Sequence, residues 1–373
     1  MYGLTTGIGN TAVGGAALDG AVTGNYNTAV GYVALSASTS ATDNTAMGYN
    51  ALGVASTGGF NTAVGSIALD AMTEADRNTA VGYAAMSTNI LSDRNVALGA
   101  YALFTHNVAT NADGYNTAVG EQAGYLVSTG IYNTFVGGLA GDGTDDGGSN
   151  VAMGYQALSG NCGDNNTVLG AGAAIATSGG ENTIVGKNAG YAMTSAFNNL
   201  ILGTDAGRTG SPGGNITTGD NEINLGDENI TECNIQVDWT IASDERDKTD
   251  FTALDVGLDF VNALAPVTYK WDKRSKYIDK DDPSVDLDAV SHDGTHKEDW
   301  LDIGFKAQEV EALEIAAGYK IADKTNLTTS LTGDGKQYGI QYSKFVPILV
   351  KAVQQLSATV ETLQAEIELL KGE

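Results

Sequence analysis

The stretch Asn10-Thr11-Ala12-Val13-Gly14 recurs as Asn27-Thr28-Ala29-Val30-Gly31 and, with Met in place of Val, as Asn44-Thr45-Ala46-Met47-Gly48. Most copies follow one another at an interval of 17 residues, and one interval lengthens to 21. A fixed period this short predicts a solenoid in which each repeat forms one coil and stacks on the next. The later copies begin at Asn61, Asn78, Asn95, Asn116, Asn133, Asn150, Asn166, Asn182 and Asn199.

Each repeat is too short for two packed helices and fits two short strands of four or five residues joined by turns rich in Gly, Asn, Asp and Ser. The alternation Thr-Ala-Val places Ala and Val on opposite faces of a strand. A second apolar group, such as Ala16-Ala17-Leu18, follows most copies. We therefore predict a mainly β protein whose residues 1–226 form a β-solenoid of the β-helix or β-roll type.

The repeated Asn predicts a ladder, because stacked Asn side chains can hydrogen-bond to one another and to the turn backbone. Tyr follows the repeat Gly in several coils and forms either a sugar-stacking stripe or, as we prefer, an aromatic ladder or inter-chain contact. These tyrosines are Tyr32, Tyr49, Tyr83 and Tyr155.

No cofactor or metal is predicted for this chain. Residues 141–148 carry acidic side chains between glycines, but they lack the spacing of a twelve-residue calcium loop, and we interpret them as a solvated turn. His292 and His296 lie in a polar stretch and are interpreted as surface residues rather than a metal pair. Cys162 and Cys233 lack metal-type spacing and are expected to be free thiols.

Composition and charge restrict the partners of this chain of 373 residues. A net charge of −26 argues against nucleic acid, because phosphate binding needs clustered cations. The 49 glycines follow no three-residue period, which excludes collagen. No apolar run approaches the ~20 residues of a membrane helix, so no membrane insertion is predicted. Residues 1–6 show no basic or apolar leader, so no signal peptide is expected and synthesis in a cytoplasm is predicted.

Residues 227–242 are expected to form a capping strand and a linker. Residues 221–226 resemble a degenerate last coil, and residues 234–241 alternate apolar and polar side chains as a strand does. Terminal repeats are often atypical because they cap an open stack. Trp239 is therefore interpreted as a capping aromatic.

Residues 243–373 have the composition of an ordinary α+β domain. The pattern predicts helices over residues 254–264 and 307–313, strands over residues 267–271 and 337–342, and a polar loop over residues 273–299.

The C-terminal stretch carries a heptad pattern. Its apolar residues alternate spacings of 4 and 3, which predicts a coiled coil over residues 346–371. The choice of β-branched residues and Leu by itself favours two strands, whereas thin Ala- and Val-based coils need partners and favour three chains. We predict a homotrimer. The seam consists of Leu349, Val353, Leu356, Val360, Leu363, Ile367 and Leu370.

Two resemblances extend these predictions. The repeats resemble the head repeats of trimeric autotransporter adhesins, in which three chains pack side by side. The motifs Ser243-Asp244-Glu245-Arg246-Asp247-Lys248, Tyr269-Lys270-Trp271 and Gly304-Phe305-Lys306-Ala307-Gln308-Glu309-Val310 occur in this order, followed by Tyr342 and a long helix. Together they resemble the endosialidase-type intramolecular chaperone domain found at the C-terminal end of bacteriophage tailspikes and tail fibres.

This second resemblance implies a trimeric chaperone and a cut between Ala242 and Ser243. By motif position, Ser243 is the reactive serine and Lys248 its basic partner, while Asp244 and Arg246 orient the turn. A serine hydroxyl needs a nearby base, and a five-residue spacing requires a turn or a neighbouring chain to bring Lys248 close. The expected reaction occurs once in cis, with no turnover of an external substrate.

The sequence thus predicts a virion component, a phage tail fibre or tailspike made in the host cytoplasm. Its expected partners are two further copies of itself, another tail or fibre protein at the N-terminus, and a host surface glycan or protein receptor. Two alternatives stay open: a mosaic trimeric adhesin of a bacterial surface, and a polysaccharide-degrading spike, whose paired carboxylates we do not find.

Overall fold

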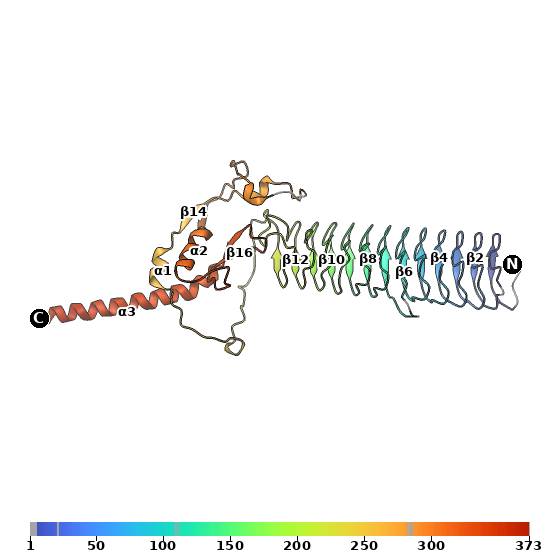
Figure 1. The fold of residues 1–373 in the computed structure, drawn as a ribbon, viewed down its shortest axis with the longest axis horizontal. Coiled ribbons are helices and arrows are strands. Elements are labelled where there is room, and N and C mark those ends of the chain that lie inside the picture. Colours follow the sequence, from blue (N-terminus) through green and yellow to red (C-terminus); the bar gives the residue numbers. More distant parts are fainter. Residues whose placement is uncertain are drawn as a thin grey trace. The chain divides into compact units, whose positions relative to one another are not determined.

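The computed structural model describes residues 6–20, 22–108, 110, 112–280, 282 and 286–372. The chain divides into two compact units, Met1–Asp227 and Glu228–Glu373, which we describe separately (Figure 1). Residues 1–5, on which the prediction of no signal peptide depends, lie outside the described part. Within that part, no helix is long and apolar enough to cross a membrane.

The first unit is a β-solenoid, as predicted. Its strands form one parallel sheet in chain order, and equivalent residues pair, as in Thr11↔Thr28 and Thr28↔Thr45. The degenerate last coil supplies the final strand. The strands are β1 (Thr11–Val13), β2 (Thr28–Val30), β3 (Thr45–Met47), β4 (Thr62–Val64), β5 (Thr79–Val81), β6 (Val96–Leu98), β7 (Thr117–Val119), β8 (Thr134–Val136), β9 (Val151–Met153), β10 (Thr167–Leu169), β11 (Thr183–Val185), β12 (Leu200–Leu202) and β13 (Ile223–Leu225).

The prediction of two strands per coil was wrong. Each coil has one strand of three residues, and the second apolar group is a turn that contains left-handed residues such as Leu18 (φ 50°) and Leu35 (φ 48°). These residues still bond from coil to coil, as Leu18 N–H does to the Ala34 carbonyl at 3.0 Å. Left-handed residues bend the chain sharply, so the ladder continues without an extended strand.

The solenoid core is narrow and built from two rows of side chains. The middle residue of most strands is an Ala, as in Ala29 and Ala46, that points inward and is fully buried, and so are Leu residues of the turn, as in Leu35 and Leu52. The glycine that ends each strand is required by close approach of neighbouring coils. A Cβ on Gly31 (φ 138°) would lie 2.2 Å from the carbonyl oxygen of Gly48.

One coil replaces the small inward Ala with a large aromatic ring. Phe135 on β8 is fully buried, and a Cβ on Gly141 would lie 2.6 Å from its ring. A Cβ on Gly124 would lie 3.1 Å from the same ring. The glycines at these positions therefore make room for Phe135.

Replacing Phe135 by Ala is expected to destabilise the solenoid by about 3–5 kcal/mol, because neighbouring glycines cannot fill the cavity that remains. Urea unfolding followed by circular dichroism measures this loss. Thr134→Ala on the outward side of the same strand is the control and is expected to cost less than about 1 kcal/mol. Equal effects of the two substitutions would contradict a packing role for the ring.

The Asn ladder is present as predicted. Asn27 donates its backbone N–H to Asn10 Oδ1 at 2.8 Å and its side-chain amide to the Ala41 carbonyl at 2.7 Å. Asn44 repeats the first contact with Asn27 Oδ1 at 3.0 Å. The ladder continues through Asn199, whose N–H bonds to Asn182 Oδ1 at 3.0 Å. It satisfies buried backbone N–H groups along one corner of the solenoid, although the side-chain amide nitrogen of Asn150 has no hydrogen-bond partner among the described residues.

The longest coil carries a buried imidazole beside this ladder. His106 Nε2 lies 2.9 Å from Ser92 Oγ and 3.3 Å from Asn116 Nδ2, and the ring is fully buried. Because the Asn116 amide nitrogen can only donate, Nε2 accepts and the ring is neutral. Burial lowers the pKa of His106 to about 4.

Acid is therefore expected to weaken the solenoid through His106. Its folded pKa of about 4 lies below its ordinary 6.5, so its contribution is full above pH 6.5 and is lost as pH falls toward 4. The loss amounts to about 3 kcal/mol at most. Unfolding midpoints at several pH values for the wild type and His106→Gln measure it, and this comparison removes the effect of carboxylates such as Asp93. Parallel pH profiles would contradict the assignment.

The second unit is a small α+β domain. Strand β14 pairs with β15 and β16 with β17, both antiparallel. Helix α1 and strands β14 and β17 are shorter than predicted, helix α2 extends beyond its predicted end at residue 313, and β15 and β16 were not predicted. The elements are η1 (Glu245–Asp247), α1 (Leu258–Ala263), β14 (Val267–Tyr269), η2 (Arg274–Tyr277), η3 (Leu287–Ala289), β15 (Asp302–Gly304), α2 (Ala307–Ala316), β16 (Thr329–Leu331), β17 (Tyr338–Ile340), η4 (Tyr342–Lys344) and α3 (Phe345–Lys371).

The core of this unit joins α1, α2 and the first turns of α3. Its buried residues include Phe260, Val310 and Phe345. Phe305 stacks on Phe345 with ring centroids 5.4 Å apart. Buried Glu314 of α2 accepts hydrogen bonds from the backbone and hydroxyl groups at the start of β16, including Thr328 Oγ1 at 2.6 Å.

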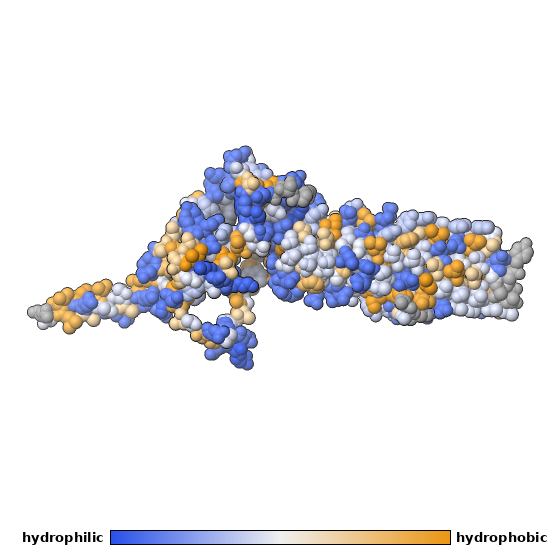
Figure 2. All heavy atoms as spheres, in the orientation of Figure 1, coloured by the Kyte–Doolittle hydropathy of each residue, from blue (hydrophilic) through white to orange (hydrophobic). Residues whose placement is uncertain are grey.

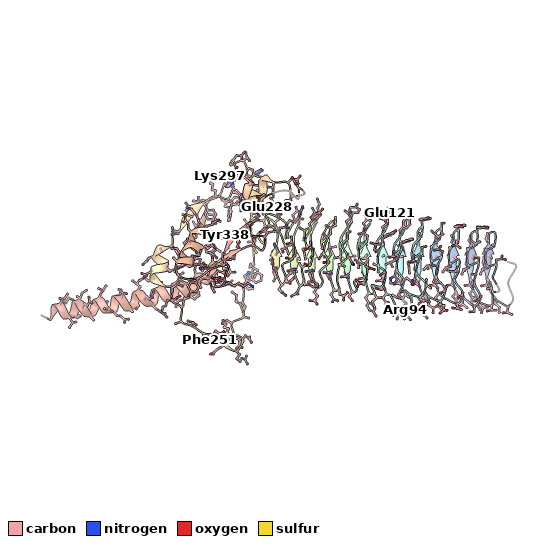
Figure 3. All side chains as sticks on the ribbon, in the orientation of Figure 1. Arg94, Glu121, Glu228, Phe251, Lys297 and Tyr338 are labelled. Atoms are coloured by element: carbon pink, nitrogen blue, oxygen red, sulfur yellow. The ribbon has the colours of Figure 1, made fainter. Side chains whose placement is uncertain are left out.

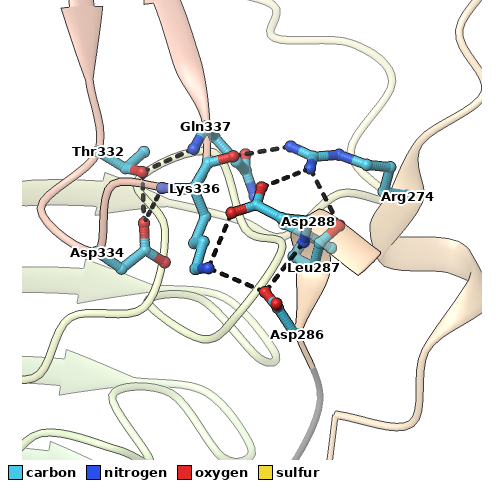
Figure 4. Close-up of polar contacts among 8 residues, drawn as sticks. All are labelled: Arg274, Asp286, Leu287, Asp288, Thr332, Asp334, Lys336 and Gln337. Atoms are coloured by element: carbon cyan, nitrogen blue, oxygen red, sulfur yellow. Dashed lines mark hydrogen bonds and ion pairs between the residues drawn. The ribbon is translucent and has the colours of Figure 1, made fainter. Parts of the chain in front are cut away.

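A charged network ties the long polar loop to the β16–β17 hairpin (Figure 4). Lys336 Nζ lies 2.9 Å from Asp286 Oδ1 and 2.8 Å from Asp288 Oδ2, and these hydrogen bonds hold the pKa of both carboxyls below the usual range. Arg274 contacts Asp288 at 3.0 Å and donates to the Lys336 carbonyl at 2.7 Å. The predicted loop over residues 273–299 is present, although residues 281 and 283–285 fall outside the described part.

The capping strand predicted over residues 234–241 is not formed. These residues are exposed and bond only locally, as Trp239 N–H does to Asp238 Oδ1 at 2.8 Å. Trp239 is 70% exposed. A strand needs a hydrogen-bonded neighbour, and among the described residues none pairs with this segment.

The predicted C-terminal helix is present as α3, with Pro347 in its first turn, where a missing N–H is tolerated. Ile348 and Ala352 pack on the core, whereas every residue from 353 to 372 is exposed. The heptad seam of Leu and Val residues therefore has no partner within one chain, and the coiled coil stays a prediction.

Candidate functional site

The segment after residue 242 folds into one tight turn that brings Ser243 and Lys248 together. Asp244 begins the 3₁₀ turn η1, and Lys248 ends it with its N–H on the Glu245 carbonyl. Lys248 Nζ lies 2.5 Å from Ser243 Oγ and 3.2 Å from the Ser243 carbonyl oxygen. A regular helix would not align residues five apart, but a 3₁₀ turn with extended flanking residues does.

Asp244 and Arg246 hold this turn in shape. Asp244 Oδ1 accepts the backbone N–H of Arg246 at 2.9 Å, which caps the turn, and Asp244 Oδ2 lies 2.6 Å from Arg246 Nη2. The Arg246 guanidinium and backbone N–H together hold the pKa of the Asp244 carboxyl below its usual value. The two side chains thus position the turn without touching Ser243 Oγ.

The Ser243–Lys248 pair lies open to solvent. Every residue from 229 to 253 is exposed, including both members of the pair. Among the hydrogen bonds of the described residues, Lys248 is the side chain that contacts Ser243 Oγ. Lys248 Nζ thus lies within hydrogen-bond reach of Ser243 Oγ, the separation that a nucleophile and its base require.

The other motif residues have structural roles that the sequence did not reveal. Tyr269 OH and Trp271 Nε1 both donate to Asp302 Oδ2, at 3.3 and 3.2 Å, and so join the ends of β14 and β15. Burial and the nearby carboxylate raise the pKa of Tyr269 to about 12. Tyr342 OH receives the Phe305 N–H at 3.2 Å at the start of α2.

The other residues considered in the sequence as possible metal ligands or sugar-binding residues do not form such a site in the described part of the chain. In the described part of the chain, no group of His, Cys, Asp or Glu side chains could hold a metal ion. His296 instead packs on Tyr277 with ring centroids 4.6 Å apart. Tyr32 and Tyr49 stack at 6.0 Å with nearly parallel rings, as an aromatic ladder does. Both rings remain more than half exposed.

Fold and site thus define a parallel β-solenoid followed by an α+β unit that begins with a Ser–Lys pair on a capped turn. Residues 243–319 match a peptidase family described as chaperone of endosialidase. The match begins at Ser243, the first residue of the turn. No curated protein and no solved structure matches the chain. The chain therefore combines a repeat solenoid with a C-terminal segment that is similar to the chaperone-of-endosialidase family.

Proposed function

We propose that the chain is a trimeric tail fibre or tailspike protein of a bacteriophage, and that its C-terminal unit assembles the trimer and is then released by a cut between Ala242 and Ser243. The observation that carries this proposal is the 2.5 Å contact of Lys248 Nζ with Ser243 Oγ at the first residue of the family match. A serine that both follows the bond to be cut and touches a potential base is placed for self-cleavage.

The chemistry follows from the atoms at this position. Ser243 Oγ attacks the carbonyl carbon of Ala242, the bond from that carbon to Ser243 N breaks, and an ester forms. The hydroxyl proton passes to Lys248 Nζ and from there to the departing amine. Water then hydrolyses the ester, which leaves a carboxylate on Ala242 and a free hydroxyl and amine on Ser243. A lysine amine accepts a proton near neutral pH only where its surroundings disfavour the ammonium form.

We expect the surroundings that favour a neutral lysine amine to form only when the trimer assembles. In the single chain both side chains of the pair are exposed to water. Two further copies of the chain would exclude water from this turn and shift Lys248 toward the neutral amine. The cut would then follow trimer formation rather than precede it.

The outward face of the solenoid sheet supports packing between copies. The third residue of each strand is Val, Met, Leu or a similar apolar side chain that points away from the core, and we call this set the outer row. Figure 2 shows hydrophobic residues on the visible face of the solenoid and along α3. An apolar row this long is unusual on a monomer. Its exposed members include Val13, Met47, Leu98, Met153, Leu169, Leu202 and Leu225.

The remaining parts of the proposal concern place and partners. The product would be a virion component made in the host cytoplasm, with residues 1–242 as a receptor-binding rod for a host surface glycan or protein. Its N-terminal end would join another tail or fibre protein. The net charge of −26 suits an elongated particle that must not bind nucleic acid nonspecifically.

Expression of the full chain and mass measurement under denaturing conditions test the proposal. The expected result is two fragments that correspond to residues 1–242 and 243–373, together with a trimer by sedimentation before denaturation. A chain that sediments as a trimer and stays whole would overturn self-cleavage, and a single folded chain would overturn the assembly role.

A further inference from the structure

The residue immediately before each ladder Asn has left-handed backbone, as Phe60 does (φ 60°), and we call these residues the corner row. Backbone N–H groups of the row bond to the preceding coil, as that of Arg77 does to the Gly59 carbonyl at 3.0 Å. Figure 3 shows Arg94 of this row on the edge of the solenoid opposite to Glu121. The row consists of Gly9, Tyr26, Asp43, Phe60, Arg77, Arg94, Tyr115, Tyr132, Ser149, Asn165, Glu181 and Asn198.

Five consecutive coils place aromatic rings and guanidinium groups in the corner row, namely Phe60, Arg77, Arg94, Tyr115 and Tyr132, which we call the aromatic–arginine patch. Arg77 Cζ lies 5.3 Å from the centroid of the Phe60 ring, and Arg94 Cζ lies 5.6 Å from that of Tyr115. The rings of Tyr115 and Tyr132 stack with centroids 5.8 Å apart, and all three aromatic residues are half-exposed. At the β spacing of ~4.8 Å per coil, the patch is about 20 Å long.

The fold does not require large side chains at these corners. Asn165 (φ 63°) and Asn198 (φ 54°) form the same left-handed corner in later coils, and Asn adopts this backbone more readily than aromatic residues do. The patch is also local, because the row continues beyond Tyr132 with Ser149, Asn165 and Glu181. Packing between parallel copies uses a row that runs the length of the solenoid, as the outer row does. The patch therefore suits a separate ligand.

The charges around the patch restrict that ligand. Arg94 forms an ion pair with Asp113, and Asp76 Oδ2 lies 4.0 Å from Arg77 Nη1. Asp93 accepts the backbone N–H of Asp76 at 2.7 Å, so three carboxylates accompany the two guanidinium groups. Together with the net charge of −26, this excess of acid disfavours a polyanion. Neighbouring donors and acceptors suit hydroxyl groups, which both donate and accept hydrogen bonds, and exposed ring carbons suit the apolar faces of sugars.

We propose that the aromatic–arginine patch binds an uncharged, extended glycan that lies along the solenoid, with successive sugars on successive coils. This inference rests on the receptor-binding role proposed above for residues 1–242, and it names the site and the receptor class. The rings of Phe60, Tyr115 and Tyr132 supply apolar contact, and Arg77 with the neighbouring carboxylates supplies hydrogen bonds to sugar hydroxyls. Each chain contains a complete site, because all five residues of the patch come from one solenoid.

An array of bacterial surface polysaccharides, neutral and acidic, tests the site with protein expressed from the full chain. Tyr115→Asn and Arg77→Asn are compared with Tyr26→Asn, the same kind of change in the corner row two coils before the patch. Because Asn retains the left-handed corner, all three variants are expected to keep the circular dichroism of the wild type. Each patch variant is expected to bind the neutral polysaccharides recognised by the wild type about tenfold more weakly, whereas Tyr26→Asn binds them as the wild type does.

Three results would overturn the glycan site: no binding to any neutral polysaccharide of the array, binding to acidic polysaccharides alone, or equal affinities of Tyr26→Asn and Tyr115→Asn. Sedimentation and denatured mass of the same samples test assembly and cleavage separately. A trimer that cuts itself and binds no glycan overturns the site and leaves the proposed assembly standing. A single chain whose binding depends on Tyr115 and Arg77 overturns the proposed assembly and confirms the site.

Discussion

A chain with Ser243 replaced by Ala is expected to assemble as the wild type does and to remain whole. The substitution removes Oγ, the atom that contacts Lys248 Nζ, and leaves the capped turn of Asp244 and Arg246 unchanged. Without a nucleophile the acyl shift has no route, so the expected effect is complete loss of fragments rather than a slower cut. Denatured mass and sedimentation, measured on the same sample, separate cleavage from assembly.

Two variants of Lys248 sharpen this test. Lys248→Met removes the base, and Lys248→Arg keeps a cation that does not release its proton near neutral pH, so both are expected to stop the cut. If Lys248 served only as a positive charge, Lys248→Arg would still be cleaved. Asp244→Asn is expected to slow the cut without abolishing it, because Asp244 only positions the turn.

Matched substitutions on the same unit control for general damage. Ser291 and Lys297 are exposed in the polar loop, and Ser291→Ala and Lys297→Met are expected to cleave at the wild-type rate (Figure 3). Cleavage of the Ser243→Ala trimer would show that another nucleophile acts, and the Ser–Lys assignment would then be wrong.

The solenoid could be predicted because the same types of side chain recur at equivalent positions of successive coils. The Asn at each corner, the inward Ala and the close-packed Gly each meet the same neighbour in every coil. The number of strands per coil could not be read from this pattern. Ala-Ala-Leu resembles a strand in composition, whereas Leu18 and Leu35 adopt left-handed backbone that no propensity scale favours.

In the C-terminal unit, a hydrophobic pattern indicates which face of a segment is apolar but not which segment covers that face. Residues 234–241 alternate as a strand, yet none of the described residues pairs with them. Strand β16 was not predicted because Thr329 and Ser330 give it little apolar character, and its position is fixed by Glu314 on α2. The Ser243–Lys248 contact depends on a 3₁₀ turn, so spacing alone did not predict it, and only the family motif indicated it.

Replacing Leu356 and Val360 together by Asp is expected to abolish both the trimer and the cut. These residues lie in the α3 seam and are 49% and 43% exposed in the single chain. In a coiled coil each Asp would place a carboxylate in an apolar interior, at a cost of several kcal/mol, roughly 3 or more for each. Ala358→Asp with Ala365→Asp adds the same charge on the opposite face of the helix and is expected to preserve both trimer formation and cleavage.

Sedimentation measures trimer formation and denatured mass measures cleavage, so the two properties are tested independently. If the seam variant still assembled and cleaved, α3 would not be the element that gathers the chains; if it stayed single yet cleaved, the pair at residues 243 and 248 would work without assembly.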